Sequence, residues 1–174
     1  KSLLGGHIWD WKDQGLARYD EHGVKSWGYG GDYERDTDPN SGNFCCNGIV
    51  SPDGTPKPAM WTCKYVYQPV EFTMLDKEEL RLSLKNRNFH RSTEGYAYSW
   101  EIKDEDGLIQ NGDLDVPVMA PGESVEVSVP AKKMSFKPGA VYMLNLYSKE
   151  SAALPYAASG HCHSSEQFVL NERV

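Results

Sequence analysis

The stretch GGHIWDWKDQGL, Gly5–Leu16, concentrates residue types that contact ligands. If it forms a strand, alternation places Trp9 and Trp11 on one face and Asp10 on the other. The apolar C–H face of a sugar ring packs well on the negative face of an indole, so a tryptophan here can act as a stacking platform. The structural alternative is that both rings fill the core of a sheet or barrel, and the pattern favours that alternative for Trp11.

Five aspartates lie in or shortly after this stretch and could supply acid–base chemistry. Hydrolysis of a glycosidic bond with retention needs two carboxyl groups about 5–5.5 Å apart, one of them kept protonated. Nothing in the local sequence pairs two of these side chains, so capping, turn and ion-pair roles are favoured. The five are Asp10, Asp13, Asp32, Asp36 and Asp38.

A second candidate motif is NFCCNG, Asn43–Gly48. Its Asn47-Gly48 pair is typical of a turn, while the apolar and thiol residues before it indicate a buried loop. A buried asparagine needs partners for its amide, and a bound cation or a substrate hydroxyl can provide them. A structural turn and a ligand contact both stay open for this motif.

The four cysteines do not show the paired spacing of a disulfide framework. A zinc site built from two of them and two histidines is conceivable, but no C-x-x-C spacing supports it, and free thiols are favoured. The residues concerned are Cys45, Cys46, Cys63 and Cys162, with His161 and His163.

Composition excludes several classes of partner. The chain has 174 residues and a net charge of −7, with lysines and arginines scattered singly. Nucleic acids and anionic membranes bind clustered cations, so neither is expected as a partner. No apolar run approaches the roughly 20 residues that span a bilayer, and no targeting signal is visible.

The first part of the chain is expected to be the last βα unit of a larger fold. Leu3–Trp11 is short, apolar and aromatic, which predicts a strand buried on both faces, as in a parallel sheet. An irregular segment over about 15–55 follows, and loops this long are usually functional. The sequence then predicts a helix over Pro58–Val66, with Thr55 as a possible cap and proline in its first turn.

The second part of the chain predicts an antiparallel β-sandwich of immunoglobulin-like type. Short alternating runs are separated by turn residues over about a hundred residues, which suits such a module. The fold class is therefore mainly β, with a sandwich over 69–174 preceded by a barrel-type segment over 1–68. The predicted strands are Leu80–Arg87, Tyr96–Asp104, Leu108–Val116, Ser124–Pro130, Ala140–Lys149 and Ser165–Leu170.

Four motifs in this order resemble the C-terminal region of large bacterial β-galactosidases, the lacZ-type branch of glycoside hydrolase family 2. They are GGHIWDWKDQGLARYDEHG, WGYGGD, NFCCNGIVSPDGTPKPAMW and AASGHCHSSEQFVL. The resemblance implies that residues 1–68 end a (β/α)8 barrel, with Leu3–Trp11 as its eighth strand and Pro58–Val66 as its last helix. Residues 69–174 would be the following immunoglobulin-like domain. Sites of such barrels gather at the carboxyl ends of the strands.

The resemblance also implies a function for the full-length enzyme, which is retaining hydrolysis of terminal non-reducing β-D-galactosides. Both catalytic residues of the family are glutamates on earlier strands, so this chain is expected to hold no catalytic residue and to be inactive alone. Trp9 matches a tryptophan of the galactose-binding floor. Phe44, through its carbonyl, and Asn47, through its side-chain oxygen, match sodium ligands. Because that sodium helps to hold the galactose 6-hydroxyl, Asn47 also counts as substrate-binding.

The same resemblance adds magnesium as a further candidate ion and a homo-oligomer as the expected assembly of the full-length enzyme. It leaves the bacterial cytoplasm and the periplasm open as compartments. Two other functions stay open as well. One is a non-catalytic immunoglobulin-like interaction or carbohydrate-binding module, which the buried-strand composition of Leu3–Trp11 disfavours. The other is another family 2 activity, β-glucuronidase or β-mannosidase.

A single barrel strand without its neighbours leaves backbone donors and acceptors unpaired. We therefore expect residues 1–68 to pack on the sandwich, to pair with another copy, or to be partly mobile.

Overall fold

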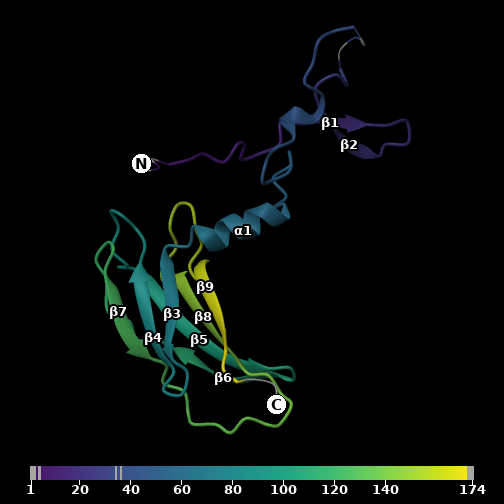
Figure 1. The fold of residues 1–174 in the computed structure, drawn as a ribbon. Coiled ribbons are helices and arrows are strands. Elements are labelled where there is room, and N and C mark those ends of the chain that lie inside the picture. The colour runs from purple at the N-terminus through teal and green to yellow at the C-terminus, as the bar shows by residue number, and fades with distance from the viewer. Residues whose placement is uncertain (1–2, 4, 34, 36, 172–174) are drawn as a thin grey trace. The chain divides into compact units, whose positions relative to one another are not determined.

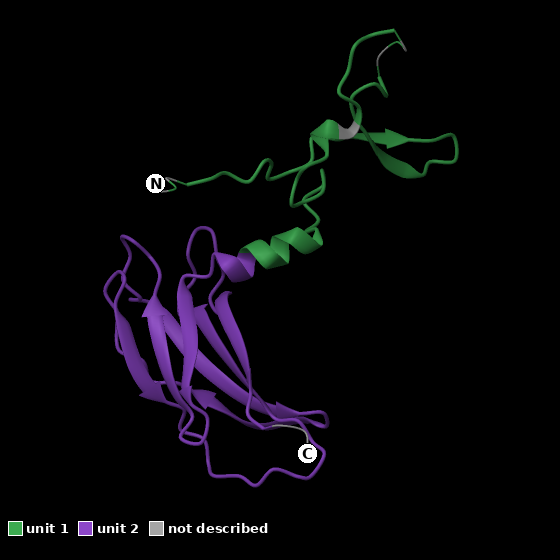
Figure 2. Ribbon diagram, in the orientation of Figure 1, with its two compact units in different colours: residues 1–63 green, residues 64–174 purple. Residues whose placement is uncertain are grey.

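A computed structural model of the chain describes residues 3, 5–33, 35 and 37–171. It divides into unit 1, residues 1–63, and unit 2, residues 64–174 (Figure 2). In chain order the elements are β1 (Leu16–Tyr19), β2 (Lys25–Gly28), the 3-10 helix η1 (Gly42–Cys45), α1 (Pro58–Val66), β3 (Val70–Asp76), β4 (Arg81–Asn86), β5 (Tyr96–Asp104), β6 (Gly107–Asp113), β7 (Ser124–Ser128), β8 (Met143–Glu150) and β9 (Cys162–Val169).

Unit 2 is a β-sandwich of two antiparallel sheets (Figure 1). One sheet has the order β3-β4-β7 and the other has the order β6-β5-β8-β9. The chain changes sheet between β4 and β5, between β6 and β7, and between β7 and β8. This Greek-key order is typical of immunoglobulin-like sandwiches. The predicted mainly β fold class, with its antiparallel sandwich, is confirmed.

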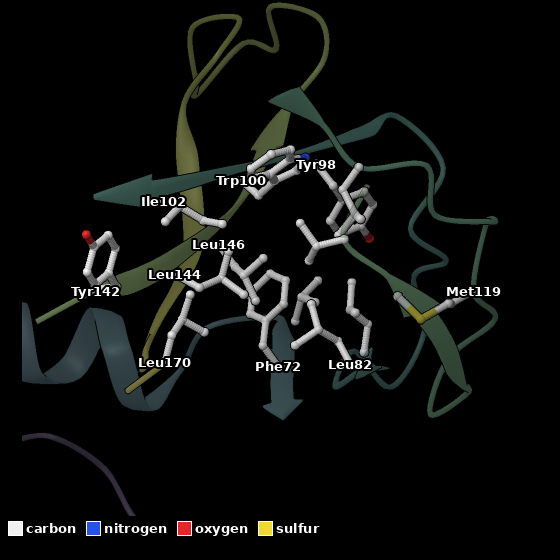
Figure 3. Close-up of a cluster of buried hydrophobic side chains, with 14 residues drawn as sticks. Phe72, Leu82, Tyr98, Trp100, Ile102, Met119, Tyr142, Leu144, Leu146 and Leu170 are labelled. Carbon is white, nitrogen blue, oxygen red and sulfur yellow. The ribbon is translucent and has the colours of Figure 1, made fainter. Parts of the chain in front are cut away.

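The core of unit 2 lies between the two sheets and follows the period of two along each strand. Phe72 faces Leu84 across β3 and β4, and Trp100 pairs with Leu146 across β5 and β8. Figure 3 shows Phe72, Trp100 and Leu146 among the side chains that converge from both sheets. The buried cluster is Val70, Phe72, Leu82, Leu84, Tyr98, Trp100, Ile102, Leu114, Met119, Val129, Tyr142, Leu144, Leu146 and Leu170.

Most sandwich strands lie where the alternation predicts them. The bounds of β5, Tyr96–Asp104, are those predicted, and the other predicted strands shift by a few residues at one or both ends. The sequence interpretation missed β3, although Val70 and Phe72 alternate with exposed residues there. Pro69 stands directly before that run and marks a boundary, which is also where a strand can begin.

Helix α1 has the predicted bounds, but Thr55 does not cap it. Its backbone N–H donates to Asp53 Oδ1 at 3.0 Å, and its carbonyl accepts from Ser51 N–H at 2.8 Å, so Thr55 belongs to a turn. The helix instead starts with Pro58, whose missing N–H costs nothing in the first turn. Within the described part of the chain, no helix is long and apolar enough to cross a membrane.

Two predictions for unit 1 are wrong. The described residues between 3 and 11 form no strand, and Leu3 is 91% exposed. Parallel pairing there is limited to one bridge between Lys12 and Val50, because a buried parallel strand needs hydrogen-bonded neighbours on both sides. The segment predicted to be irregular contains the hairpin β1–β2. Asp20 closes the turn of this hairpin, because its side chain accepts the N–H groups of His22 and Val24.

Candidate functional site

The two stretches that carry the predicted site residues lie beside each other in unit 1. Residues 10–13 and 49–50 run in parallel and are joined by backbone hydrogen bonds of 3.0–3.2 Å. Trp9 precedes the first stretch and Asn47 precedes the second, so the fold brings together residues that are far apart in sequence. The bonds run from Ile49 N–H to the Asp10 carbonyl, from Val50 N–H to the Trp11 carbonyl, and from Asp13 N–H to the Val50 carbonyl.

A buried carboxylate fixes this junction. The Asp13 side chain is 9% exposed, and its oxygens lie 2.6 and 2.7 Å from Lys57 Nζ. Asp13 Oδ1 also accepts the Gly48 N–H at 2.8 Å. A Cβ on Gly48 would overlap the backbone of Lys12 and Asp13, so this position admits only glycine without rearrangement. Sequence reasoning missed both Lys57 and Gly48 as site-forming residues, since no local pattern pairs residues at such separations.

The predicted cation ligands meet each other in the structure. Helix η1 carries Phe44, and the side-chain amide of Asn47 contacts the Phe44 carbonyl oxygen. Both residues are exposed, and the Phe44 side chain is 72% exposed. A main-chain carbonyl and an amide oxygen are hard donors of the kind that alkali and alkaline-earth cations take. The residues present therefore fit a small hard cation.

Trp9 presents its indole openly, with 74% of its surface exposed. The peptide bond between Trp9 and Asp10 is cis. Asp10 Oδ2 accepts a hydrogen bond from Gln14 Nε2 at 2.9 Å. Trp11, for which packing in a core was favoured, is 58% exposed, and that expectation is wrong in this structure. Among the described residues of unit 1, the only buried hydrophobic ones are Ile49 and Val50, so there is no larger core in which Trp11 could pack.

The described aspartates have the bridging and turn roles that the sequence favours. Asp32 accepts the Tyr29 N–H at 2.7 Å and lies 3.3 Å from an Arg18 nitrogen. Asp38 pairs with Arg35 at 3.1 Å. Asp36 lies outside the described residues.

The thiols offer little chemistry. All four cysteines are free and partly buried. Burial raises the pKa of the Cys46 thiol, and the neighbouring Cys45 raises it further, so the thiolate is disfavoured. Among the residues that the structure describes, no three His, Cys, Asp or Glu side chains gather as a metal site. The zinc alternative thus finds no support in the described residues.

Comparison with known families agrees with the two-unit fold. Residues 82–171 match the family described as Beta-galactosidase, domain 4. Residues 1–72 match Glycosyl hydrolases family 2, TIM barrel domain. A barrel-domain segment followed by a sandwich defines the class, which is that of the family 2 glycosyl hydrolases. More particularly, the chain belongs to the β-galactosidase domain 4 family, since that match covers more than half of it.

Curated bacterial relatives are similar along nearly the whole chain. Beta-galactosidases of Aeromonas hydrophila, Alteromonas mediterranea and Photobacterium profundum are 34%, 36% and 36% identical over 97% of the chain. The chain spans 16% of the length of each relative. A solved Bacteroides uniformis beta-glucuronidase 2 shares 14% identity over 57% of this chain and 12% of its own, with a TM-score of 0.36, too low to bear on fold or function.

Proposed function

We propose that this chain is a segment of a β-galactosidase that hydrolyses terminal non-reducing β-D-galactosides with retention. Its relatives of that name match 97% of the chain at 34–36% identity. The observation that carries the local part of the proposal is the meeting of Asn47 with the Phe44 carbonyl, next to the stretch that follows Trp9. In this account unit 1 binds and orients the sugar, and the chemistry belongs to carboxylates elsewhere in the enzyme.

Trp9 is proposed as the platform for the galactosyl ring. Its indole is open to solvent, and the backbone on its C-terminal side is pinned to residues 49–50. A platform of this kind gains binding energy from the apolar face of the sugar and loses little by ordering, because the indole has only two rotatable bonds.

Phe44 and Asn47 are proposed as ligands of a sodium ion. A half-turn of the Asn47 amide would aim its oxygen, instead of its nitrogen, toward the region of the Phe44 carbonyl. When bound, sodium supplies a fixed positive charge that holds a sugar hydroxyl, for which the galactose 6-hydroxyl is the candidate. This chain would contribute two oxygen ligands, the Phe44 carbonyl and the Asn47 side-chain oxygen. Asn47 would also contact the sugar hydroxyl.

The division of labour between the domains is part of the same proposal. Residues 1–68 would end the barrel and 69–174 would form the following sandwich, which spaces domains and subunits in a homo-oligomer. Pro69 suits a boundary because it stands directly before β3, and Gln68 Oε1 accepts the Ser165 N–H at 3.1 Å, so the contacts of the sandwich begin at this point. The 174-residue chain alone is expected to hydrolyse no chromogenic galactoside.

The test measures sodium dependence in the full-length enzyme that carries this segment. Replacing Asn47→Ala removes one oxygen ligand and should raise the sodium concentration for half-maximal turnover of an o-nitrophenyl β-galactoside by about tenfold or more. Asn111→Ala, an exposed position in β6, is the matched control. An unchanged sodium dependence in Asn47→Ala would refute the assignment. Faster turnover of the matching glucuronide or mannoside would replace the galactosidase activity with another family 2 activity.

A further inference from the structure

A cavity of about 400 Å³ opens at the end of the sandwich where β3, β5, β7 and β9 finish. It lies within unit 2 and takes no part in the proposed sugar site. Its volume falls in the range of about 300–1,000 Å³ that small-molecule sites occupy. The lining residues are Lys77, Glu78, Glu79, Leu80, Ile102, Val129, Ala131, Lys132, Lys133, Met134, Phe136 and Leu170.

The floor of the cavity is apolar. Ile102, Val129 and Leu170 are buried members of the sandwich core, so the opening reaches into the core itself. Met134 and Phe136 add flexible and aromatic surface to the wall. A cavity floor of this composition favours an alkyl chain or an aryl group over a sugar.

The mouth of the cavity is cationic. Lys77, Lys132 and Lys133 are exposed, and none has an ion-pair partner among the described residues. Two acids, Glu78 and Glu79, stand against these three lysines; Glu79 also lies 3.7 Å from Arg81, which pairs with Glu126 at 3.2 Å. The mouth is thus locally positive on a chain whose net charge is −7. Such a local field attracts an anionic group.

The wall is formed before any ligand arrives. Gln110 clamps Lys132 through both backbone groups, at 2.8 Å to its N–H and 3.0 Å to its carbonyl. Phe136 packs against Tyr142 with ring centroids 4.9 Å apart. A preformed wall saves the ordering cost of binding. Leu80 lines the same cavity and, with a φ of 49°, ends the turn between β3 and β4.

From the apolar floor, the lysine mouth and the fixed wall, we propose that this cavity binds a single-chain amphiphile with a carboxylate head and an apolar tail. The tail would lie over Ile102, Val129 and Leu170, and the carboxylate would meet the ammonium groups of Lys132 and Lys133. This site is separate from sugar hydrolysis, so it stands or falls independently of the proposed function.

The test uses the 174-residue chain and laurate as the probe. With 13C-methyl methionine, saturable laurate binding should shift the Met134 signal and leave that of Met60, in α1, unchanged. Laurate that shifts both signals alike, or neither, would overturn the proposal, since binding would then be unspecific or absent.

Two variants separate charge from apolar contact. Lys132→Gln with Lys133→Gln should weaken laurate binding roughly three- to tenfold, since exposed charge pairs are individually weak. Lys64→Gln with Lys85→Gln removes the same charge elsewhere and should leave the affinity unchanged. Equal affinity in both double variants, or equal binding of the uncharged lauryl alcohol, would refute recognition of the carboxylate. Phe136→Ser tests the wall separately and should weaken both probes if the tail contacts it.

Discussion

At the scale of single residues, the carboxylate of Asp13 organises unit 1. It holds Gly48 and Lys57 at once, and so ties the stretch after Trp9 to the loop before Val50. Removing one partner of a buried ion pair is costly, because the remaining charge loses its compensation. The position of the proposed sugar platform relative to the cation ligands therefore depends on this ion pair.

Replacing Lys57→Met should loosen that junction by roughly 1–3 kcal/mol, because the Asp13 charge loses its partner. Amide hydrogen exchange at Gly48 and Val50 should accelerate by about ten- to a hundredfold, while exchange in the sandwich stays unchanged. Lys12→Met, at an exposed side chain, is the control. Exchange that is equally fast in both variants would show that the ion pair does not hold the loop.

His163 in β9 carries a pH dependence. Its ring packs on Tyr96 with centroids 4.1 Å apart, and Nδ1 lies 3.3 Å from Ser164 Oγ. Burial lowers the pKa of His163 to about 4; Glu150 opposes this, while His161, Arg91 and Lys64 add to it. Above pH 6.5 the group is neutral in both states. Between pH 6.5 and 4 only the unfolded chain binds the proton, so stability falls as the pH drops.

Because of His163, the free energy of unfolding should fall by roughly 2–3 kcal/mol between pH 7 and pH 4. Urea denaturation at pH 7 and pH 4 measures it. His163→Phe keeps the ring and should flatten the difference by that amount, whereas His90→Phe, at an exposed position, should not. An unaltered pH dependence in His163→Phe would contradict the buried neutral state.

At the scale of elements, Asn86 joins the end of β4 to two loops of the sandwich. Its buried Nδ2 donates to the carbonyls of Arg91, Met119 and Ala120 at 2.9–3.2 Å. Its Oδ1 accepts two N–H bonds from Asn88. The Asn86 side chain thus bonds to carbonyl groups of the loops. The alternating pattern of the strands does not predict these bonds.

Asn86→Leu keeps the volume but removes the partner of the Arg91 carbonyl and of two Asn88 N–H groups, whereas the Met119 and Ala120 carbonyls keep the N–H bonds from Thr93 and Glu123. We expect the sandwich to lose about 3 kcal/mol of stability, seen as a lower thermal midpoint in calorimetry. Asn111→Leu, at an exposed position, should change the midpoint little. A midpoint for Asn86→Leu that equals that of the control would mean that water replaces the lost bonds.

Much of the sandwich can be predicted from sequence because its strands are half-buried and carry their own period of two. Tyr96–Asp104 has such alternation, and its bounds match the structure. Leu3–Trp11 has no such alternation. A strand buried on both faces can be predicted there only by assuming that neighbouring strands exist. Hairpin β1–β2 was missed because its strands are short and largely exposed.

The site shows the same division. Trp9, Phe44 and Asn47 are predictions from motifs, and the fold places the stretches next to them side by side. Lys57 and Gly48 escaped, because an ion pair and a close backbone approach between distant segments leave no local pattern. Residue type indicates what could bind a sugar, whereas long-range contacts decide what positions it.

At the scale of the whole molecule, the two units differ in how they are stabilised. Unit 2 has a continuous core between two sheets. Among the hydrophobic residues described in unit 1, only Ile49 and Val50 are buried, while aromatic side chains such as Trp9 and Phe44 are open. Large exposed apolar surface marks regions that contact something else. Unit 1 is therefore better suited to complete a larger site than to act alone.

Trp9→Ala in the full-length enzyme tests whether this segment supplies the sugar platform of a β-galactosidase. Steady-state turnover of an o-nitrophenyl β-galactoside is compared with that of Trp11→Ala, another exposed tryptophan of the same stretch. We predict that Trp9→Ala lowers kcat/KM by about tenfold or more, since a buried indole–sugar contact is lost, and that Trp11→Ala lowers it far less. Equal kcat/KM in the wild type and Trp9→Ala would contradict the account.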